Sequence, residues 1–235
     1  MKKKALHSIL IKPAGPDCNM ACTYCFYSHK SELFPGEKVR RMSDDVLEET
    51  IRQTMLQSGD HVSFGWQGGE PTLMGLPFFQ KAVNWQKQYG FGPGAKSVGN
   101  GLQTNGLLID ERWIRFLRKN DFLIGLSLDG PKHVHDHYRS RLGGEGTWSK
   151  VVENARRLLE AGVAVNAVMV VSEYSARFTD EIYAFQKELG LTYMQFIPCL
   201  ETDAKNPSAA ACIVRSGDSG YRIAVGVEIP APFSS

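Results

Sequence analysis

The sequence is short of cysteine, of charge of one sign and of long apolar runs, and each shortage excludes a class of protein. Only five of the 235 residues are cysteine, too few for a disulfide-stabilised secreted scaffold. The 27 basic and 25 acidic residues leave a net charge of +2 with no basic face, so we expect no nucleic-acid partner. The longest apolar candidate, residues 163–171, contains Asn166 and is too short to span a membrane.

We also expect no secretory leader. Three lysines at positions 2–4 precede an apolar stretch, but that stretch is short, is broken by His7 and Ser8, and ends without a small-residue cleavage site. We therefore expect a cytoplasmic protein with no membrane partner. In that compartment, clustered cysteines indicate metal binding rather than disulfides.

What is present is a regular alternation of strand-like and helix-like segments. The expected strands are residues 6–11, 61–67, 98–104, 122–128, 163–171 and 193–197. The expected helices are residues 43–57, 76–89, 110–120, 147–161 and 179–189. Such alternation is typical of right-handed βαβ units and a parallel sheet.

Six such units can form an open doubly wound sheet or an incomplete barrel. No strand-to-helix turn carries a Gly-x-Gly-x-x-Gly fingerprint, whereas polar and glycine-rich motifs follow nearly every strand. In a parallel barrel all these strand ends meet on one face, where sites lie. We therefore predict an α/β fold, a partial (β/α)6 barrel over residues 1–201. Residues 202–235 lack sustained periodicity and are predicted to form an irregular tail.

Three cysteines within eight residues form the most distinctive stretch. Cys18, Cys22 and Cys25 can point three thiolates at one spot, a ligand set that suits zinc or an iron–sulfur cluster. His29 is placed to complete a Cys3His zinc site, so the loop alone leaves both readings open. Cys199, far along the chain, is better interpreted as a core thiol.

The cysteine loop Cys18-x3-Cys22-x2-Cys25, with Tyr24 before the last cysteine, resembles the signature of radical S-adenosylmethionine enzymes. Gly68-Gly69-Glu70-Pro71, one strand later, resembles the second motif of that superfamily. A closer similarity, to the anaerobic sulfatase-maturating enzymes, extends from about residue 6 to residue 200. It is carried by Ile11-Lys12-Pro13, Cys25-Phe26-Tyr27, Gln67-Gly68-Gly69-Glu70-Pro71-Thr72-Leu73, Leu102-Gln103-Thr104-Asn105-Gly106, Gly125-Leu126-Ser127-Leu128-Asp129-Gly130-Pro131 and Gln195-Phe196-Ile197.

The resemblance implies both the cofactors and the reaction. Cys18, Cys22 and Cys25 would hold three irons of a 4Fe–4S cluster, and S-adenosylmethionine would bind the fourth. An electron from the cluster, itself supplied by a donor such as flavodoxin or ferredoxin, would cleave S-adenosylmethionine to methionine and a 5′-deoxyadenosyl radical. The radical would oxidise a cysteine or serine of an unfolded sulfatase polypeptide to Cα-formylglycine.

The resemblance also assigns site residues. The positions matched to cofactor contacts are Tyr24, Gly68, Gly69, Glu70, Ser127, Arg139 and Leu200. Four strand-end residues are expected to orient cofactor or substrate, namely Gln67, Gln103, Thr104 and Asn105. The polar stretch with His133, His135 and His137 is interpreted as solvated or supporting histidines rather than a second metal site.

We expect no counterpart of the family's C-terminal domain in the sequence given. That domain is rich in cysteine, binds two auxiliary clusters and carries the aspartate that acts as general base; here only Cys199 and Cys212 lie outside the loop, so no residue is assigned as the base. Three alternatives stay open at this point. They are another peptide-modifying radical enzyme, a zinc-stabilised non-catalytic module, and an inactive remnant.

Overall fold

The protein forms a single curled sheet of six parallel strands. The structure, a computed structural model, describes residues 5–33, 39–90, 95–202 and 210–212. The strand order in the sheet equals the chain order, β1-β2-β3-β4-β5-β6, and every neighbouring pair is parallel. The strands are β1 (Leu6–Ile11), β2 (Ser58–Trp66), β3 (Ser97–Thr104), β4 (Phe122–Ser127), β5 (Ala164–Val171) and β6 (Tyr193–Pro198). The predicted α/β class and partial six-unit barrel are confirmed.

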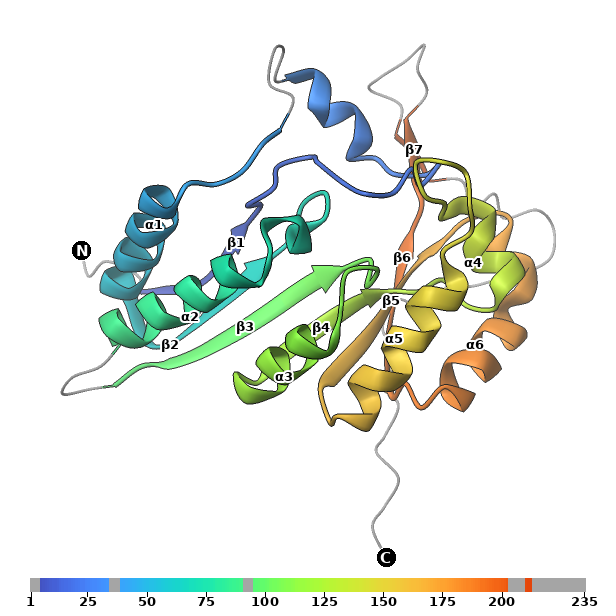
Figure 1. Ribbon diagram of the computed structural model, residues 1–235. Coiled ribbons are helices and arrows are strands. Elements are labelled where there is room, and N and C mark those ends of the chain that lie inside the picture. Colours follow the sequence, from blue (N-terminus) through green and yellow to red (C-terminus); the bar gives the residue numbers. More distant parts are fainter. Residues whose placement is uncertain (1–4, 34–38, 91–94, 203–209, 213–235) are drawn as a thin grey trace, which may run out of the picture.

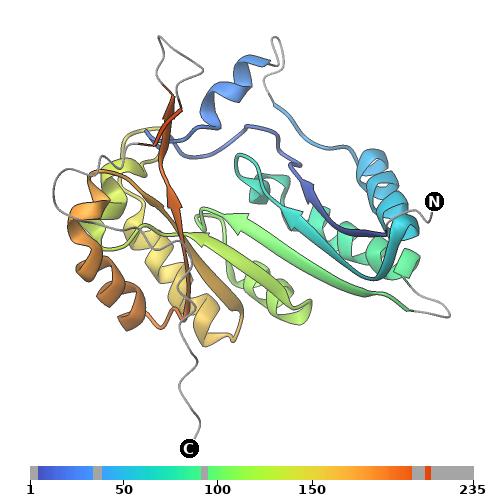
Figure 2. The same cartoon turned by 180° about the vertical axis from the view of Figure 1, so that it is seen from behind.

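The helices lie on the outer, convex side of the sheet. Figure 1 shows them in front of the strands, and Figure 2, from behind, shows the concave side with the strands exposed. The helices are α1 (Asp44–Gln57), α2 (Leu76–Gly90), α3 (Glu111–Lys119), α4 (Lys132–Tyr138), α5 (Trp148–Glu160) and α6 (Thr179–Glu188). Short 3-10 helices are η1 (Ser28–Leu33), η2 (Pro71–Met74) and η3 (Ser175–Phe178).

Side-chain caps start two of the helices at the expected residues. The Ser43 Oγ accepts a hydrogen bond of 3.3 Å from Val46 N at the start of α1. The Asp110 carboxylate accepts one of 2.9 Å from Trp113 N at the start of α3. Each cap satisfies a backbone donor that has no partner inside the helix. Both predicted helix starts are confirmed.

The core fills the space between the sheet and the helices. Val62, Phe64 and Trp66 alternate along β2 and are fully buried, so one face of that strand lies against the helix layer. On α2, Phe78 and Phe79 are buried against them, and the Trp66 and Phe79 rings are 5.5 Å apart in an edge-to-face arrangement. This apolar layer holds the strand ends in fixed positions below the site.

The structure departs from the sequence-based expectation in the region after β4. The sequence did not predict α4, because Lys132–Tyr138 is largely polar and lacks an apolar stripe. Its His135 is fully buried, so of the two interpretations given for this histidine, solvated or supporting, only the supporting one fits. The cause is a pair of buried hydrogen-bond partners, which satisfy the imidazole away from water.

The predicted domain boundary at residues 201 and 202 falls inside a short strand. This strand, β7 (Leu200–Thr202), pairs antiparallel with β8 (Ala210–Cys212). The rest of the predicted tail, residues 203–209 and 213–235, lies outside the described residues. The two-part division of the chain therefore stays a prediction.

Candidate functional site

The cysteine loop crosses the carboxyl ends of the strands. It follows β1 and, in Figure 1, runs in blue above the strand ends toward α4. Its far side is attached by backbone hydrogen bonds to the segment after α4. Ala21 N donates to Ser140 O at 2.9 Å, and Thr23 N donates to Tyr138 O at 3.1 Å. Segments far apart in the chain thus meet at the loop.

The near side of the loop is pressed against the glycine pair after β2. Gly69 N donates to Gly15 O at 2.8 Å, and Glu70 N donates to Asp17 O at 2.7 Å. A Cβ placed on Gly69 would lie 2.1 Å from the Asp17 carbonyl oxygen, and one on Gly68 would lie 2.8 Å from Gly15 O. Gly68 also has a φ of +123°, which favours glycine. Only glycines allow the two backbones to come this close.

The three loop cysteines are half-buried, and Cys22 and Cys25 act electrostatically on Cys18. Burial raises the pKa of the Cys18 thiol to about 11, and nearby Cys22 and Cys25 add to this effect. Burial also raises the pKa of Cys22, while the Arg139 guanidinium lowers it. The Asn105 side-chain nitrogen lies 3.8 Å from Cys18 Sγ, within donor distance of that sulfur. Among the described residues, no three His, Cys, Asp or Glu side chains form the geometry of one bound metal ion.

Glu70 points into the protein. One carboxylate oxygen accepts hydrogen bonds from Thr72 N, Thr72 Oγ1 and Thr104 Oγ1 at 2.9, 2.6 and 2.8 Å. The other accepts one from Asn105 N at 2.8 Å. Burial raises the pKa of this carboxyl, while the four donors act in the opposite direction. Glu70 thus connects the glycine pair after β2 to the end of β3, and Thr104 and the Asn105 backbone are its donors.

Tyr24 and Arg139 share one buried carboxylate, that of Asp129. The Tyr24 hydroxyl donates to Asp129 Oδ2 at 2.5 Å, and Arg139 Nε donates to the same oxygen at 2.8 Å. The Arg139 side chain is 8% exposed and that of Asp129 2%, so this ion pair is shielded from water. Burial by itself would lower the pKa of Arg139, but the facing carboxylate raises it above its usual range. The guanidinium therefore stays charged beside the cysteine loop.

Polar side chains line the concave face next to the loop. A hollow of about 190 Å³ includes Gln67, Gln103 and Gly125 in its lining. Gln103 Nε2 donates to Ser127 Oγ at 3.1 Å, and a Cβ on Gly125 would lie 2.2 Å from Gln103 Oε1. The glycine thus leaves room for the amide to reach Ser127. The last expected contact, Leu200, starts β7, and its side chain lies outside the described part of the structure.

Sequence reasoning gave Asp129 no role in this site, and it interpreted His135 only as a solvated or supporting histidine. Asp129-Gly130-Pro131 contributed to the family resemblance, but Asp129 itself was given no role in the site. His135 Nδ1 accepts from Asp129 N at 3.3 Å, and its Nε2 lies 3.0 Å from Thr147 Oγ1. A polar residue directly after a strand was the available signal for Asp129, because such residues line the site in this class of fold.

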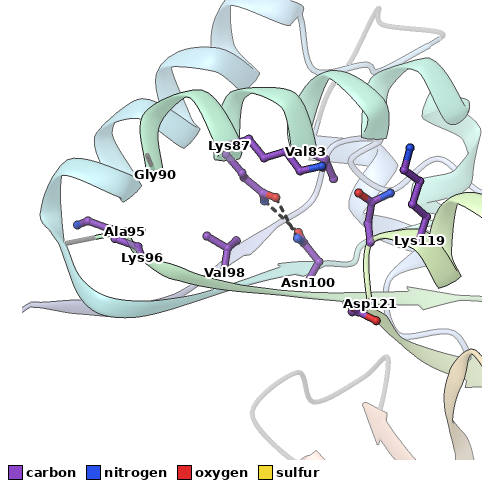
Figure 3. A pocket seen from close by; sticks show the side chains of 11 residues that line it. Val83, Lys87, Gly90, Ala95, Lys96, Val98, Asn100, Lys119 and Asp121 are labelled. Atoms are coloured by element: carbon purple, nitrogen blue, oxygen red, sulfur yellow. Dashed lines mark hydrogen bonds between the residues drawn. The ribbon is translucent and has the colours of Figure 1, made fainter. Parts of the chain in front are cut away.

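A second hollow lies at the opposite ends of the strands. Figure 3 shows it between α2 and β3, with a volume of about 310 Å³ and with Lys87, Lys96 and Lys119 on its walls. Lys96 Nζ donates to the Met55 and Ser58 carbonyls at 2.5 and 2.6 Å, which closes the end of α1. The other two lysines lie in the last turns of α2 and α3, where positive charge offsets the helix dipole. The three lysines of this hollow thus interact with the C-terminal ends of helices, so their presence does not indicate a binding site.

Comparison with known proteins decides the family. The sequence model of the Radical SAM superfamily matches residues 13–176, a range that contains the cysteine loop, the glycine pair and Arg139. The chain belongs to the Radical SAM superfamily. Among the helices in the described part of this radical SAM chain, none is both long and apolar enough to cross a membrane.

The radical SAM chain is similar to anaerobic sulfatase-maturating enzymes. It is 42% identical over 194 residues to a cysteine-type enzyme of Clostridium perfringens, covering 83% of this chain and 52% of that protein. It is 38% identical to a serine-type enzyme of Bacteroides thetaiotaomicron, covering 82% and 46%. A solved structure of native anSMEcpe with bound AdoMet and Kp18Cys peptide has a TM-score of 0.77 at 42% identity, covering 83% of this chain and 51% of that one. The chain thus spans about half the length of the curated relatives it matches.

Proposed function

We propose that this radical SAM chain carries out the cofactor chemistry of an anaerobic sulfatase-maturating enzyme. It would bind a 4Fe–4S cluster and S-adenosylmethionine, and oxidise a cysteine or serine of a sulfatase to Cα-formylglycine. The observation that carries this proposal is the close contact of the Gly68–Gly69 backbone with the cysteine loop. That contact brings the cysteine loop, which follows β1, and the glycine pair, which follows β2, together at the strand ends of an incomplete barrel.

The cysteines fit a cluster by their chemistry and placement. Cys18, Cys22 and Cys25 are half-buried sulfurs, the neighbouring cysteines help to raise the pKa of Cys18 and of Cys22, and thiolates are the usual protein ligands of such clusters. The cluster, when bound, supplies the electron that cleaves S-adenosylmethionine. The chain's own part is to hold the loop, which the hydrogen bonds to Gly15, Asp17 and the segment after α4 achieve.

The charged and polar residues around the loop fit a bound amino acid sulfonium. The Arg139 guanidinium suits the methionine carboxylate, because it is permanently charged and offers paired donors. Gly68 and Gly69 leave backbone accessible to the amino group. Ser127 and Tyr24 would contact the remainder of the cofactor, and Leu200 by resemblance would join them.

Three of the expected contacts take a supporting role in this proposal. Glu70, whose carboxylate already accepts four hydrogen bonds, would shape the glycine loop from behind. Thr104 and Asn105 would hold Glu70 in place, and the Asn105 amide would also donate to Cys18. Gln67 and Gln103 remain on the concave face, where they would orient cofactor or substrate.

The concave face would accept an extended polypeptide. Amide side chains just after β2 and on β3, β5 and β6 line its hollow, and amides can pair with the N–H and C=O groups of a peptide backbone. They are Gln67, Gln103, Asn166 and Gln195. The relative anSMEcpe has been solved with a bound peptide, which supports this placement. We propose an unfolded sulfatase segment as substrate and a cytoplasmic flavodoxin or ferredoxin as electron donor, with no nucleic-acid or membrane partner.

Peptide mass spectrometry tests the reaction. The anaerobically reconstituted protein would be incubated with S-adenosylmethionine, a strong reductant and matched sulfatase peptides that carry cysteine or serine. We expect one of the peptides to gain an aldehyde, and the Cys22→Ala variant to leave both unchanged. A different modification would indicate another peptide-modifying radical enzyme. Zinc without iron or sulfide after anaerobic purification would contradict the radical reading.

A further inference from the structure

Asp129 is a buried carboxylate for which the proposed chemistry has no direct use. It follows β4, and all its hydrogen-bonding capacity is taken up by three separate parts of the chain. Oδ2 accepts from the Tyr24 hydroxyl and from Arg139 Nε, at 2.5 and 2.8 Å. Oδ1 accepts from Val170 N at 3.1 Å and from Arg139 Nη2 at 3.3 Å. A carboxylate offers about four acceptor positions, so this one is saturated.

The four donors connect the cysteine loop, the end of α4 and β5. Tyr24 directly precedes Cys25, and Arg139 directly follows α4. The Arg139 guanidinium lies 5.4 Å from the centre of the Tyr24 ring, so the two side chains also contact each other. Asp129 is therefore the group that fixes the ring and the guanidinium in one arrangement.

The loop itself does not depend on Asp129 for its attachment. Backbone hydrogen bonds of Ala21 and Thr23 fix one side, and those of Gly69 and Glu70 fix the other. Loss of the Asp129 carboxylate would thus release two side chains while the backbone around the cysteines keeps its anchors. This separates an effect on cofactor binding from an effect on cluster binding.

The hydrogen bonds of Arg139 show how Asp129 can orient this side chain toward a ligand. Nε and Nη2 of Arg139 are engaged by Asp129, whereas no described residue accepts a hydrogen bond from Nη1. Two donors hold the guanidinium plane in position and leave the third nitrogen for a ligand. The planar group is rigid, so fixing one edge fixes the direction of the other.

We propose that Asp129 is a positioning residue for S-adenosylmethionine, which holds Tyr24 and Arg139 in the geometry that binds the cofactor. The proposal rests on the proposed function. The Asp129→Asn variant tests it. In this variant an NH2 group without charge would replace Oδ2, the oxygen that accepts hydrogen bonds from the Tyr24 hydroxyl and from Arg139 Nε. A buried donor that has no acceptor costs free energy, so the Tyr24 and Arg139 side chains would move away from their present positions.

The matched control is Asp136→Asn. Asp136 also lies on this part of the chain, but its Oδ1 accepts from Thr147 N and Trp148 N, both at 2.8 Å, at the start of α5. Its Oδ2 pairs with Lys132 Nζ at 2.6 Å, so this variant removes the same charge and that ion pair without touching Tyr24 or Arg139.

The experiment measures three quantities on each anaerobically reconstituted protein: iron and sulfide per chain, the midpoint of thermal unfolding, and the Kd for S-adenosylmethionine by equilibrium dialysis. For Asp129→Asn we expect normal cluster content and a Kd about ten- to hundredfold higher, as for loss of hydrogen bonds to charged groups. For Asp136→Asn we expect a lower unfolding midpoint with Kd within about threefold of wild type. Tyr24→Phe, which keeps the ion pair, should raise Kd less, and its effect should not add to that of Asp129→Asn.

Several outcomes would overturn the proposal. Asp129→Asn with full cluster content and wild-type Kd would make Asp129 a purely structural ion-pair partner. Tighter binding would mean that Asp129 competes with the cofactor for Arg139. Loss of the cluster in Asp129→Asn would show that the loop does need this carboxylate. If the wild-type protein loads its cluster but does not bind S-adenosylmethionine, the proposed function fails first and this proposal with it.

Discussion

The substitution Gly69→Ala tests the contact on which the site is built. The added methyl group would lie 2.1 Å from the Asp17 carbonyl oxygen and 2.6 Å from the carbonyl carbons of Pro16 and Asp17. All three atoms belong to backbone, so no side chain can rotate away. The two segments would have to separate by about 1.3 Å, from 2.1 Å to the 3.4 Å at which ordinary van der Waals contact begins.

That separation has a predictable cost. It weakens the hydrogen bonds from Gly69 N to Gly15 O and from Glu70 N to Asp17 O, which are 2.8 and 2.7 Å long. Each contributes about 1 kcal/mol net. Overpacking by a methyl group against fixed backbone adds about 1–3 kcal/mol. We expect the free energy of unfolding to fall by about 3–5 kcal/mol. A loop shift equal to that separation should also reduce S-adenosylmethionine cleavage about a hundredfold.

Urea unfolding of the protein under anaerobic conditions measures the first effect, and 5′-deoxyadenosine formation measures the second. Gly59→Ala is the matched control, because its added methyl would meet only the Ala5 Cβ, at 3.5 Å. It should change stability by no more than about 0.5 kcal/mol. If Gly69→Ala were as stable as this control and equally active, the contact between the glycine pair and the cysteine loop would not exist.

Three further changes test the surrounding structure. Burial lowers the pKa of His135 to about 4, so the unfolded chain binds the proton more readily than the folded protein does. The free energy of unfolding should therefore be constant above pH 6.5 and fall by about 3 kcal/mol toward pH 4. Urea unfolding at a series of pH values would show this decrease, and most of it should be absent in His135→Gln. Glu70→Gln places an amide among four donors and should lower the free energy of unfolding in urea by about 2 kcal/mol. The exposed Glu153→Gln should leave it almost unchanged, and equal losses in the two variants would contradict the buried network around Glu70. Asp110→Ala removes the α3 cap and should cost about 1 kcal/mol, measured by thermal unfolding; no change would mean that the cap bond is absent.

The sequence predicted the order of the main strands and helices because each has its own local signal. Ser43 and Asp110 marked helix starts that the structure confirms. Residues 61–67 were predicted as a strand, and in β2 the side chains of Phe64 and Trp66 are buried in the core. The polar helix α4 has no comparable signal, since its two buried side chains, Val134 and His135, are neighbours in a short segment.

The sequence predicted less about which way the site's side chains point. Glu70 was expected at the cofactor, but its carboxylate turns inward to donors 34 and 35 residues away. Asp129 was not singled out, because its partner Tyr24 lies 105 residues away. Such pairings depend on how the barrel closes, which local patterns do not encode. That Cys18, Cys22 and Cys25 hold a cluster remains a prediction.

The most direct test of the central claim is 5′-deoxyadenosine formation by the anaerobically reconstituted protein, given S-adenosylmethionine and a strong reductant. The Cys22→Ala variant, which removes one proposed ligand, is the blank. The account predicts 5′-deoxyadenosine from the wild-type protein and none from the variant. No product from wild-type protein with a full iron and sulfide load, or equal product from both, would contradict it.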